Sequence, residues 1–187
     1  MVTTQQKHQT LLKATEVAGI FFIVLMGSLL HFTYELSGEN VVVGLISAVN
    51  ESVWEHLKLP FFPALFLGAA QHAVMRKTYP NFWLGKAVGT FSMPLIIVVG
   101  FYAYKAVFGG HNLAYDIGLF IVSVMIGQLV SYRLISQTGA KPFNILPLAA
   151  LIVMAVIFMV FTIAPPRLEI FQDPLTGGFG LEGHSHL

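Results

Sequence analysis

Four long apolar runs dominate this sequence, at residues 11–36, 82–107, 113–135 and 143–164. A helix needs about 20 apolar residues to cross the hydrocarbon core of a bilayer, and each run is close to that length. Hydrophobic residues make up 56% of the 187 residues, and charged residues only 10%. Because lipid offers no partner to backbone polar groups, we expect an all-α, polytopic membrane helix bundle.

The stretch between the first two runs is less regular. Residues 41–49 are apolar, and residues 59–75 are apolar again but contain Pro60 and Pro63. One helix over 41–75 would be about 50 Å long, which is too long for a single crossing. Two topologies remain. Either 41–50 is a short interfacial or re-entrant helix and 51–75 is the second of five spans, or 41–59 and 61–75 both cross and the total is six.

The distribution of positive charge favours five spans. With five crossings, seven of the ten Lys and Arg residues share the N-terminal side: Lys7, Lys13, Arg76, Lys77, Lys86, Arg133 and Lys141. With six crossings the same ten residues divide five and five. Since Lys and Arg accumulate in cytoplasmic loops, we expect a plasma (inner) membrane protein with a cytoplasmic N-terminus. Residues 1–164 then form the transmembrane bundle, and residues 165–187 form an extracytoplasmic tail.

Ionisable side chains concentrate on the predicted outer side. The segment NESVWEHLK, residues 50–58, places four of them within nine positions, although a charge at the bilayer centre costs about 2.5 to 3.5 kcal/mol on insertion scales. Eight of the nine acidic residues fall on or near this side: Glu35, Glu39, Glu51, Glu55, Asp116, Glu169, Asp173 and Glu182. Five histidines join them: His31, His56, His111, His184 and His186. Acidic residues contribute little to topology, so this asymmetry indicates a functional requirement.

Residue spacing predicts which of these groups meet. His31 and Glu35 are four apart and share one helix face. Glu51 and Glu55 have the same spacing on the next predicted helix, where like charges repel. That repulsion is relieved if one carboxyl is protonated, if Lys58 pairs with Glu55, or if a cation binds between the two acids.

His56 points about 100° away from the line of Glu51 and Glu55, so it can face the first span. We therefore expect an outward-facing polar pocket built from His31, Glu35, Asn50, Glu51, Glu55 and His56. Further side chains are expected beside it: Ser47, Trp54, Lys58, Asp116 and, from the tail, Asp173.

Imidazole and carboxylate groups without a thiolate suit Zn²⁺, Mn²⁺ or Fe²⁺, and the chain contains no cysteine. The predicted metal ligands are His31, Glu35, Glu51 and His56. Haem held by His31 and His56 is an alternative. The same region also fits a metal-free enzyme in which Glu51, Glu55 and His56 transfer protons on a lipid or isoprenoid. A third alternative is a non-enzymatic transporter or a subunit of a larger membrane complex.

A net charge of +1 gives no electrostatic footprint for nucleic acid, so the expected surroundings are the lipid bilayer and a lipid-like substrate or partner subunit.

The segment SAVNESVWEHLKLPFFP, residues 47–63, resembles the signature of an uncharacterised family of small prokaryotic multi-spanning membrane proteins. HFTYELSG at 31–38 and FQDPLTGGFG at 171–180 fit the same resemblance, which covers nearly the whole chain. This family implies no particular activity. A more limited similarity links His31 and Glu35 to the H-x-x-x-E pair of sterol-isomerase-like, emopamil-binding proteins. The intramembrane His and carboxylate groups are also similar in kind to those of zinc membrane hydrolases of the alkaline-ceramidase type, although the late H-x-x-x-H is missing.

Overall fold

The computed structural model describes residues 3–75, 78–110, 112–137 and 144–183. Within these residues the secondary structure is helical, apart from one isolated bridge between Gln172 and Phe179. The helices are α1 (Thr4–Leu36), α2 (Val41–Gly44), α3 (Val53–Met75), α4 (Phe82–Phe108), α5 (Leu113–Ile135) and α6 (Ile145–Ile163), with short 3₁₀ helices η1 (Glu169–Phe171) and η2 (Gly180–Gly183). The predicted all-α class is confirmed. Predictions that involved Arg76, Lys77, His111, Lys141, His184 and His186 fall outside the described residues.

Among the described residues, four helices are long and apolar enough to cross a membrane: α1, α4, α5 and α6. They correspond to the four apolar runs, although α1 begins well before residue 11 and α6 begins at Ile145. The fifth long helix, α3, has 23 residues but carries Glu55, His56 and Lys58 in its first two turns. Length and composition therefore support four spans directly, and the fifth depends on how α3 is packed.

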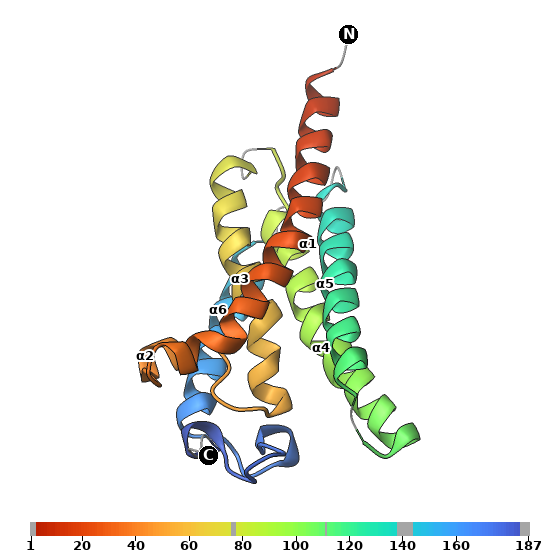
Figure 1. Ribbon diagram of the computed structural model, residues 1–187. Helices are drawn as coiled ribbons and strands as arrows, with labels where there is room; N and C mark the ends of the chain where they lie inside the picture. The colour runs from red at the N-terminus through yellow and green to blue at the C-terminus, as the bar shows by residue number, and fades with distance from the viewer. Residues whose placement is uncertain (1–2, 76–77, 111, 138–143, 184–187) are drawn as a thin grey trace.

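The two chain ends lie at opposite ends of the molecule (Figure 1). The N-terminal turns of α1 extend from one end, while α2, the first turn of α3 and the C-terminal segment lie at the other. At the N-terminal end, the side chain of Asn144 connects two helix starts, because its Oδ1 accepts from the Trp83 N–H at 2.9 Å. We refer to the opposite end, where α2 and the C-terminal segment lie, as the tail end of the bundle.

The irregular stretch before α3 differs from the helix expected over 41–50. Only the four residues of α2 are helical, and α3 begins at Val53 rather than at residue 51. The Ser52 hydroxyl accepts a hydrogen bond from the Glu55 N–H at 3.3 Å, and this cap fixes the start of the helix. Since α3 continues through Pro60 and Pro63 to Met75, the helix over 41–59 that six spans would require does not form.

Helix α1 approaches α3 closely where a proline has freed a backbone carbonyl. Pro63 has no N–H for the carbonyl of Leu59, four residues earlier. Gly27 of α1 packs against that carbonyl, and a Cβ added at Gly27 would lie 2.7 Å from the Leu59 oxygen. The absence of a side chain at Gly27 therefore lets the two helices touch, one turn away from His31.

The C-terminal segment packs on the tail end of the bundle. Phe171 of η1 is buried against Trp54 of α3, with ring centroids 4.7 Å apart. The Asn50 side-chain amide donates to the Gly180 carbonyl at 2.9 Å. Gly180 has a positive φ of 53°, and an added Cβ would collide with the Thr162 carbonyl of α6. The segment is thus fitted to the ends of α3 and α6.

Candidate metal centre

Three side chains from two parts of the chain converge at the tail end of the bundle: His31 of α1, Glu51 of the loop before α3, and His56 of α3. The Nε2 atoms of His31 and His56 are 3.1 Å apart. The Glu51 carboxylate lies 3.4 Å from His56 Nε2 and 3.7 Å from His31 Nε2. One ligand atom from each of the three residues can be chosen so that all lie within 4.8 Å of one another. We call these three residues the His–Glu trio.

The backbone of the α3 cap sets the orientation of His56. Its Nδ1 lies 2.8 Å from the Ser52 carbonyl oxygen, which can only accept, so the ring carries its proton on Nδ1. In a neutral imidazole the lone pair is then on Nε2, the atom that faces His31 and Glu51. A histidine whose far nitrogen donates to a carbonyl is the usual arrangement for a metal ligand, because it fixes both the tautomer and the ring plane.

The spacing of the trio suits a single transition-metal ion. Two nitrogens about 2.0 to 2.1 Å from a tetrahedral zinc lie about 3.3 Å apart. The observed 3.1 Å between Nε2 of His31 and Nε2 of His56 needs little adjustment to reach this separation. Two imidazoles and one carboxylate also leave a coordination position open, as catalytic zinc sites with three protein ligands do.

The trio is partly accessible rather than enclosed. The side chain of Glu51 is 44% exposed, and both histidine side chains are 30% exposed. The contact with His56 lowers the pKa of the Glu51 carboxyl, and the charge interactions with His56 and His31 act in the same direction against the effect of burial. Glu51 is therefore ionised at neutral pH, as a metal ligand must be.

Glu55 and Lys58 form a separate, fully buried ion pair. The Lys58 ammonium lies 2.5 Å from Glu55 Oε2, with side-chain exposures of 0% and 2%. The ammonium also donates to the Gly44 carbonyl at 2.8 Å and to the Thr162 hydroxyl at 2.9 Å. Glu55 in turn accepts from the Val49 N–H at 3.1 Å and from Thr162 at 3.1 Å. This network joins α2, α3 and α6 and leaves neither charge unpaired.

Glu51 and Glu55, which were predicted to share a helix face, thus have different partners. Because α3 starts at Val53, Glu51 precedes the helix and does not share the helix face of Glu55. Of the ways foreseen to relieve their repulsion, the structure has Lys58 pairing with Glu55. Glu51 meets the two histidines instead.

The other predicted pocket residues have distinct positions. Glu35 is exposed and Asp116 lies in the first turn of α5, and neither belongs to the trio. The Asp173 carboxylate accepts from Leu175 and Thr176 within its own turn.

Three further predicted residues hold the surrounding backbone. The Ser47 hydroxyl donates to the Val43 carbonyl, and the Asn50 side chain connects the Ser52 N–H to the tail. Trp54 packs on the rings of Phe158, Phe161 and Phe171.

Sequence reasoning missed two features of the buried polar groups. Thr162 lies in an apolar run and gives no signal before the fold places it beside Glu55 and Lys58. Glu16 and Lys86 form a second buried pair, 2.5 Å apart, whereas the charge distribution predicts only that Lys86 lies on the cytoplasmic side. A charged residue inside a long apolar helix is the one available signal for such a pair.

A family described as a family of unknown function, DUF6512, matches residues 4–181. The chain belongs to this family. No curated protein and no solved structure shows a significant match. The predicted membership of an uncharacterised family is thus confirmed, while the role of NESVWEHLK as its signature and a prokaryotic origin stay predictions. The family carries no activity that could be assigned to the trio.

Proposed function

We propose that this protein spans the membrane five times and binds one divalent transition-metal ion at the His–Glu trio, close to the outer face. The observation that carries the proposal is the 3.1 Å separation of two Nε2 atoms beside a carboxylate. Zn²⁺ fits this donor set best, and Mn²⁺ or Fe²⁺ also suit imidazole with carboxylate. The open coordination position allows the ion to take water or a group from a membrane-soluble substrate as a further ligand.

The packing of α3 supports its assignment as the fifth span. Its 23 residues correspond to about 34 Å of helix, enough to cross hydrocarbon. The two charges that reduce its hydropathy, Glu55 and Lys58, are paired inside the bundle and do not face lipid. An odd number of spans, with more Lys and Arg on the N-terminal side, gives a cytoplasmic N-terminus and an extracytoplasmic trio in a plasma membrane.

The position of the trio favours chemistry at the headgroup level. Phe32 is 56% exposed and Leu36 is 82% exposed, and both lie on α1 next to the turn that carries His31. Lipid-facing side chains beside a partly accessible His and Glu set are expected where a membrane-soluble substrate meets the site. The same observation favours a second candidate, a metal-free enzyme that uses His56 and Glu51 for proton transfer on a lipid or isoprenoid.

Metal titration of purified protein tests the proposal. After removal of metal with a chelator, Zn²⁺ should bind at one ion per chain, and Glu51→Gln or His56→Ala should weaken binding by at least about 10-fold, the lower bound usual for outer-shell losses. Glu35→Gln is the matched control, since it removes an exposed acid one turn from His31 and should leave the affinity unchanged.

Two results would contradict metal binding at the trio. One is a titration in which Glu51→Gln and Glu35→Gln bind Zn²⁺ as tightly as the unmodified protein. The other is the absence of a stoichiometric ion with any of the three metals. Turnover of a lipid substrate by chelator-treated protein, with loss of turnover in Glu51→Gln, would establish the metal-free alternative instead.

A further inference from the structure

A second polar layer lies inside the bundle, in the half nearer the N-terminus. Glu16 of α1 and Lys86 of α4 form an ion pair of 2.5 Å, with both side chains 3% exposed. The Gln128 amide of α5 donates to the Glu16 backbone carbonyl at 3.2 Å. Both carboxylate oxygens of Glu55 have hydrogen-bond partners, whereas Oε2 of Glu16 has none among the described residues.

Four buried side-chain atoms of this layer have no hydrogen-bond partner among the described residues. They are Oε2 of Glu16, both amide atoms of Gln71, and Oγ of Ser131. Gln71 is 6% exposed and Ser131 is 1% exposed, so bulk solvent does not satisfy them. An unpaired buried polar group costs about 1 to 3 kcal/mol, which makes four in one region unusual unless something occupies the space between them.

Contacts between the helices place these groups at one level. The stem of Lys86 passes Gly68 of α3, where an added Cβ would lie 3.7 Å from its Cγ and Cδ. Gln71 follows Gly68 by three residues and shares its helix face. Ser131 of α5 packs against Gly89 of α4, one turn from Lys86, since an added Cβ there would lie 2.8 Å from Ser131 Cβ. The layer therefore has contributions from α1, α3, α4 and α5.

Apolar side chains bound the layer on both sides. Toward the tail end lies a cluster of four buried residues, Ile23, Ala64, Met93 and Val124. Toward the N-terminal end, one helical turn from the layer, lie the buried side chains of Leu12, Met75 and Ile135. The boundary toward the N-terminal end is thus a single turn of apolar side chains on each of α1, α3 and α5, and we call it the inner boundary.

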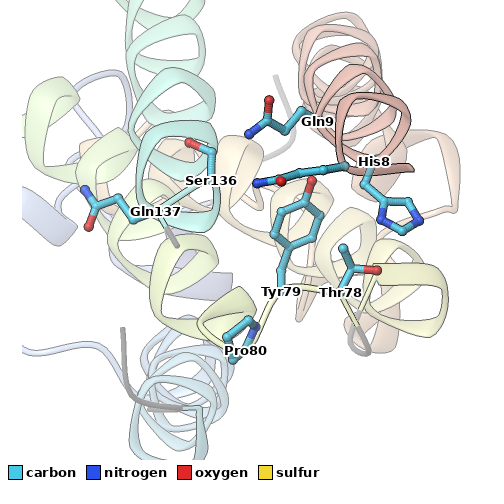
Figure 2. A pocket seen from close by; sticks show the side chains of 8 residues that line it. His8, Gln9, Thr78, Tyr79, Pro80, Ser136 and Gln137 are labelled. Carbon is cyan, nitrogen blue, oxygen red and sulfur yellow. The ribbon is translucent and has the colours of Figure 1, made fainter. Parts of the chain in front are cut away.

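At the same end of the bundle as this inner boundary lies a surface cavity of about 360 Å³, and several of the residues that line it carry polar groups (Figure 2). His8 and Gln9 line it from α1, Tyr79 from the α3–α4 connection, and Ser136 and Gln137 from the end of α5. The Tyr79 hydroxyl has no hydrogen-bond partner among the described residues, although the residue is only 8% exposed. A further buried polar atom without a partner among the described residues therefore belongs to a residue that lines the cavity.

We propose that this polar layer holds water and that this water exchanges with the N-terminal aqueous phase. Water fits because the partnerless atoms include both donors and acceptors. A second cation does not fit, because the Lys86 ammonium already neutralises Glu16. This proposal does not depend on metal binding at the trio.

Other titratable groups lie at the same end of the bundle. Their positions are as follows: His8 and Tyr79 line the cavity, Lys13 and Arg133 are exposed, Tyr132 is half-buried, and His72 packs on the rings of Phe82 and Trp83. Glu16 and Lys86 differ from these groups because both are charged, paired with each other and only 3% exposed.

Because the sequence contains no cysteine, an introduced cysteine is the single thiol in the protein and its reaction can be measured without background. Ser131→Cys places a thiol in the layer. Ser123→Cys is the matched control, because Ser123 is equally buried on the same helix, but its hydroxyl donates to the Phe120 carbonyl at 2.7 Å. Methyl methanethiosulfonate enters lipid and so reaches both sites, yet it reacts only with thiolate, which forms in water and is suppressed in apolar surroundings.

Ser131→Cys should react at least about 10-fold faster than Ser123→Cys, measured by mass spectrometry, because only the hydrated thiol ionises readily. Leu12→Ala should accelerate the reaction of Ser131→Cys further by thinning the inner boundary. Ile23→Ala, an equally buried change on the same helix but in the opposite apolar cluster, should not. Equal, slow reaction of both thiols, with no effect of Leu12→Ala, would overturn the proposal.

Gln71→Leu gives a second measurement that does not depend on a thiol. In a dry layer, removing an amide with no partner should raise the melting temperature of the protein. In a hydrated layer the amide is bonded to water, so the melting temperature should stay the same or fall. A clear rise would contradict the proposal even if the cysteine variants did not fold.

Discussion

At the scale of single residues, the two buried ion pairs differ in how completely they are satisfied. Glu55 and Lys58 have backbone and hydroxyl partners as well as each other, whereas one carboxylate oxygen of Glu16 has no hydrogen-bond partner among the described residues. The Glu55–Lys58 pair is a structural element, because each charge has an opposite charge and hydrogen-bond partners in a single fixed arrangement. The Glu16–Lys86 pair leaves room for exchange with water.

Removing one charge of the Glu55–Lys58 pair should destabilise the protein. Lys58→Met leaves the Glu55 carboxylate uncompensated at 2% exposure, so the free energy of unfolding should fall by about 3 to 5 kcal/mol. Unfolding in denaturing detergent measures this. The double variant Lys58→Met with Glu55→Gln removes both charges and should recover most of the loss. A single variant as stable as the unmodified protein would show that the pair is not sealed from water.

Much of the residue-level pattern could be predicted, because helical spacing is a local property. The 100° offset of His56 from Glu55 follows from the helix, and in the structure His56 meets His31. What local spacing could not provide was the helix start at Val53, which separates Glu51 from the face of Glu55. Thr162 joins the pair only through the long-range contact between α6 and α3, for which a single sequence holds no signal.

At the scale of elements, the crossing of α1 and α3 positions the trio. Gly27→Ala would place a Cβ 2.7 Å from the Leu59 carbonyl and 2.8 Å from the Phe120 ring, so α1 must move away from α3. The separation of His31 and His56 should then increase, and Zn²⁺ affinity should fall by about 10-fold or more, as when a ligand is misplaced. Zinc titration measures the change.

Gly118→Ala is the matched control, since a Cβ there meets no atom within 4 Å. Its zinc affinity should equal that of the unmodified protein. If Gly27→Ala binds zinc normally while its fold is intact, the close approach of α1 and α3 does not set the geometry of the trio.

Element boundaries were predictable where apolar length decides them and not where capping does. The run at 113–135 matches α5 at both ends, because the polar residues Asn112 and Ser136 bound the apolar run. The segment 41–50 is apolar enough to suggest a helix. It forms only the four residues of α2, since its later residues make the turn that brings Asn50 and Ser52 into the cap of α3.

At the scale of the whole molecule, polar chemistry is arranged at separate depths. The partly accessible trio lies at the tail end, and the buried pair of Glu55 and Lys58 connects α2, α3 and α6 nearby. The polar layer that contains Glu16 and Lys86 lies toward the N-terminus, beyond an apolar cluster. The proposed metal site and the proposed hydrated site therefore face opposite ends of the bundle. Each can be tested without disturbing the other.

The number of spans decides whether these two ends face opposite compartments. Five spans, with α3 crossing, put the chain ends on different sides of the membrane. Four spans, with α3 on the surface, would put them on the same side, as six would. In intact cells a membrane-impermeant maleimide should therefore label Leu175→Cys, which replaces a side chain 76% exposed, but should label Thr4→Cys only after permeabilisation. Labelling of both positions under the same condition would contradict five spans, and labelling of Leu175→Cys only after permeabilisation would contradict the outward orientation of the trio.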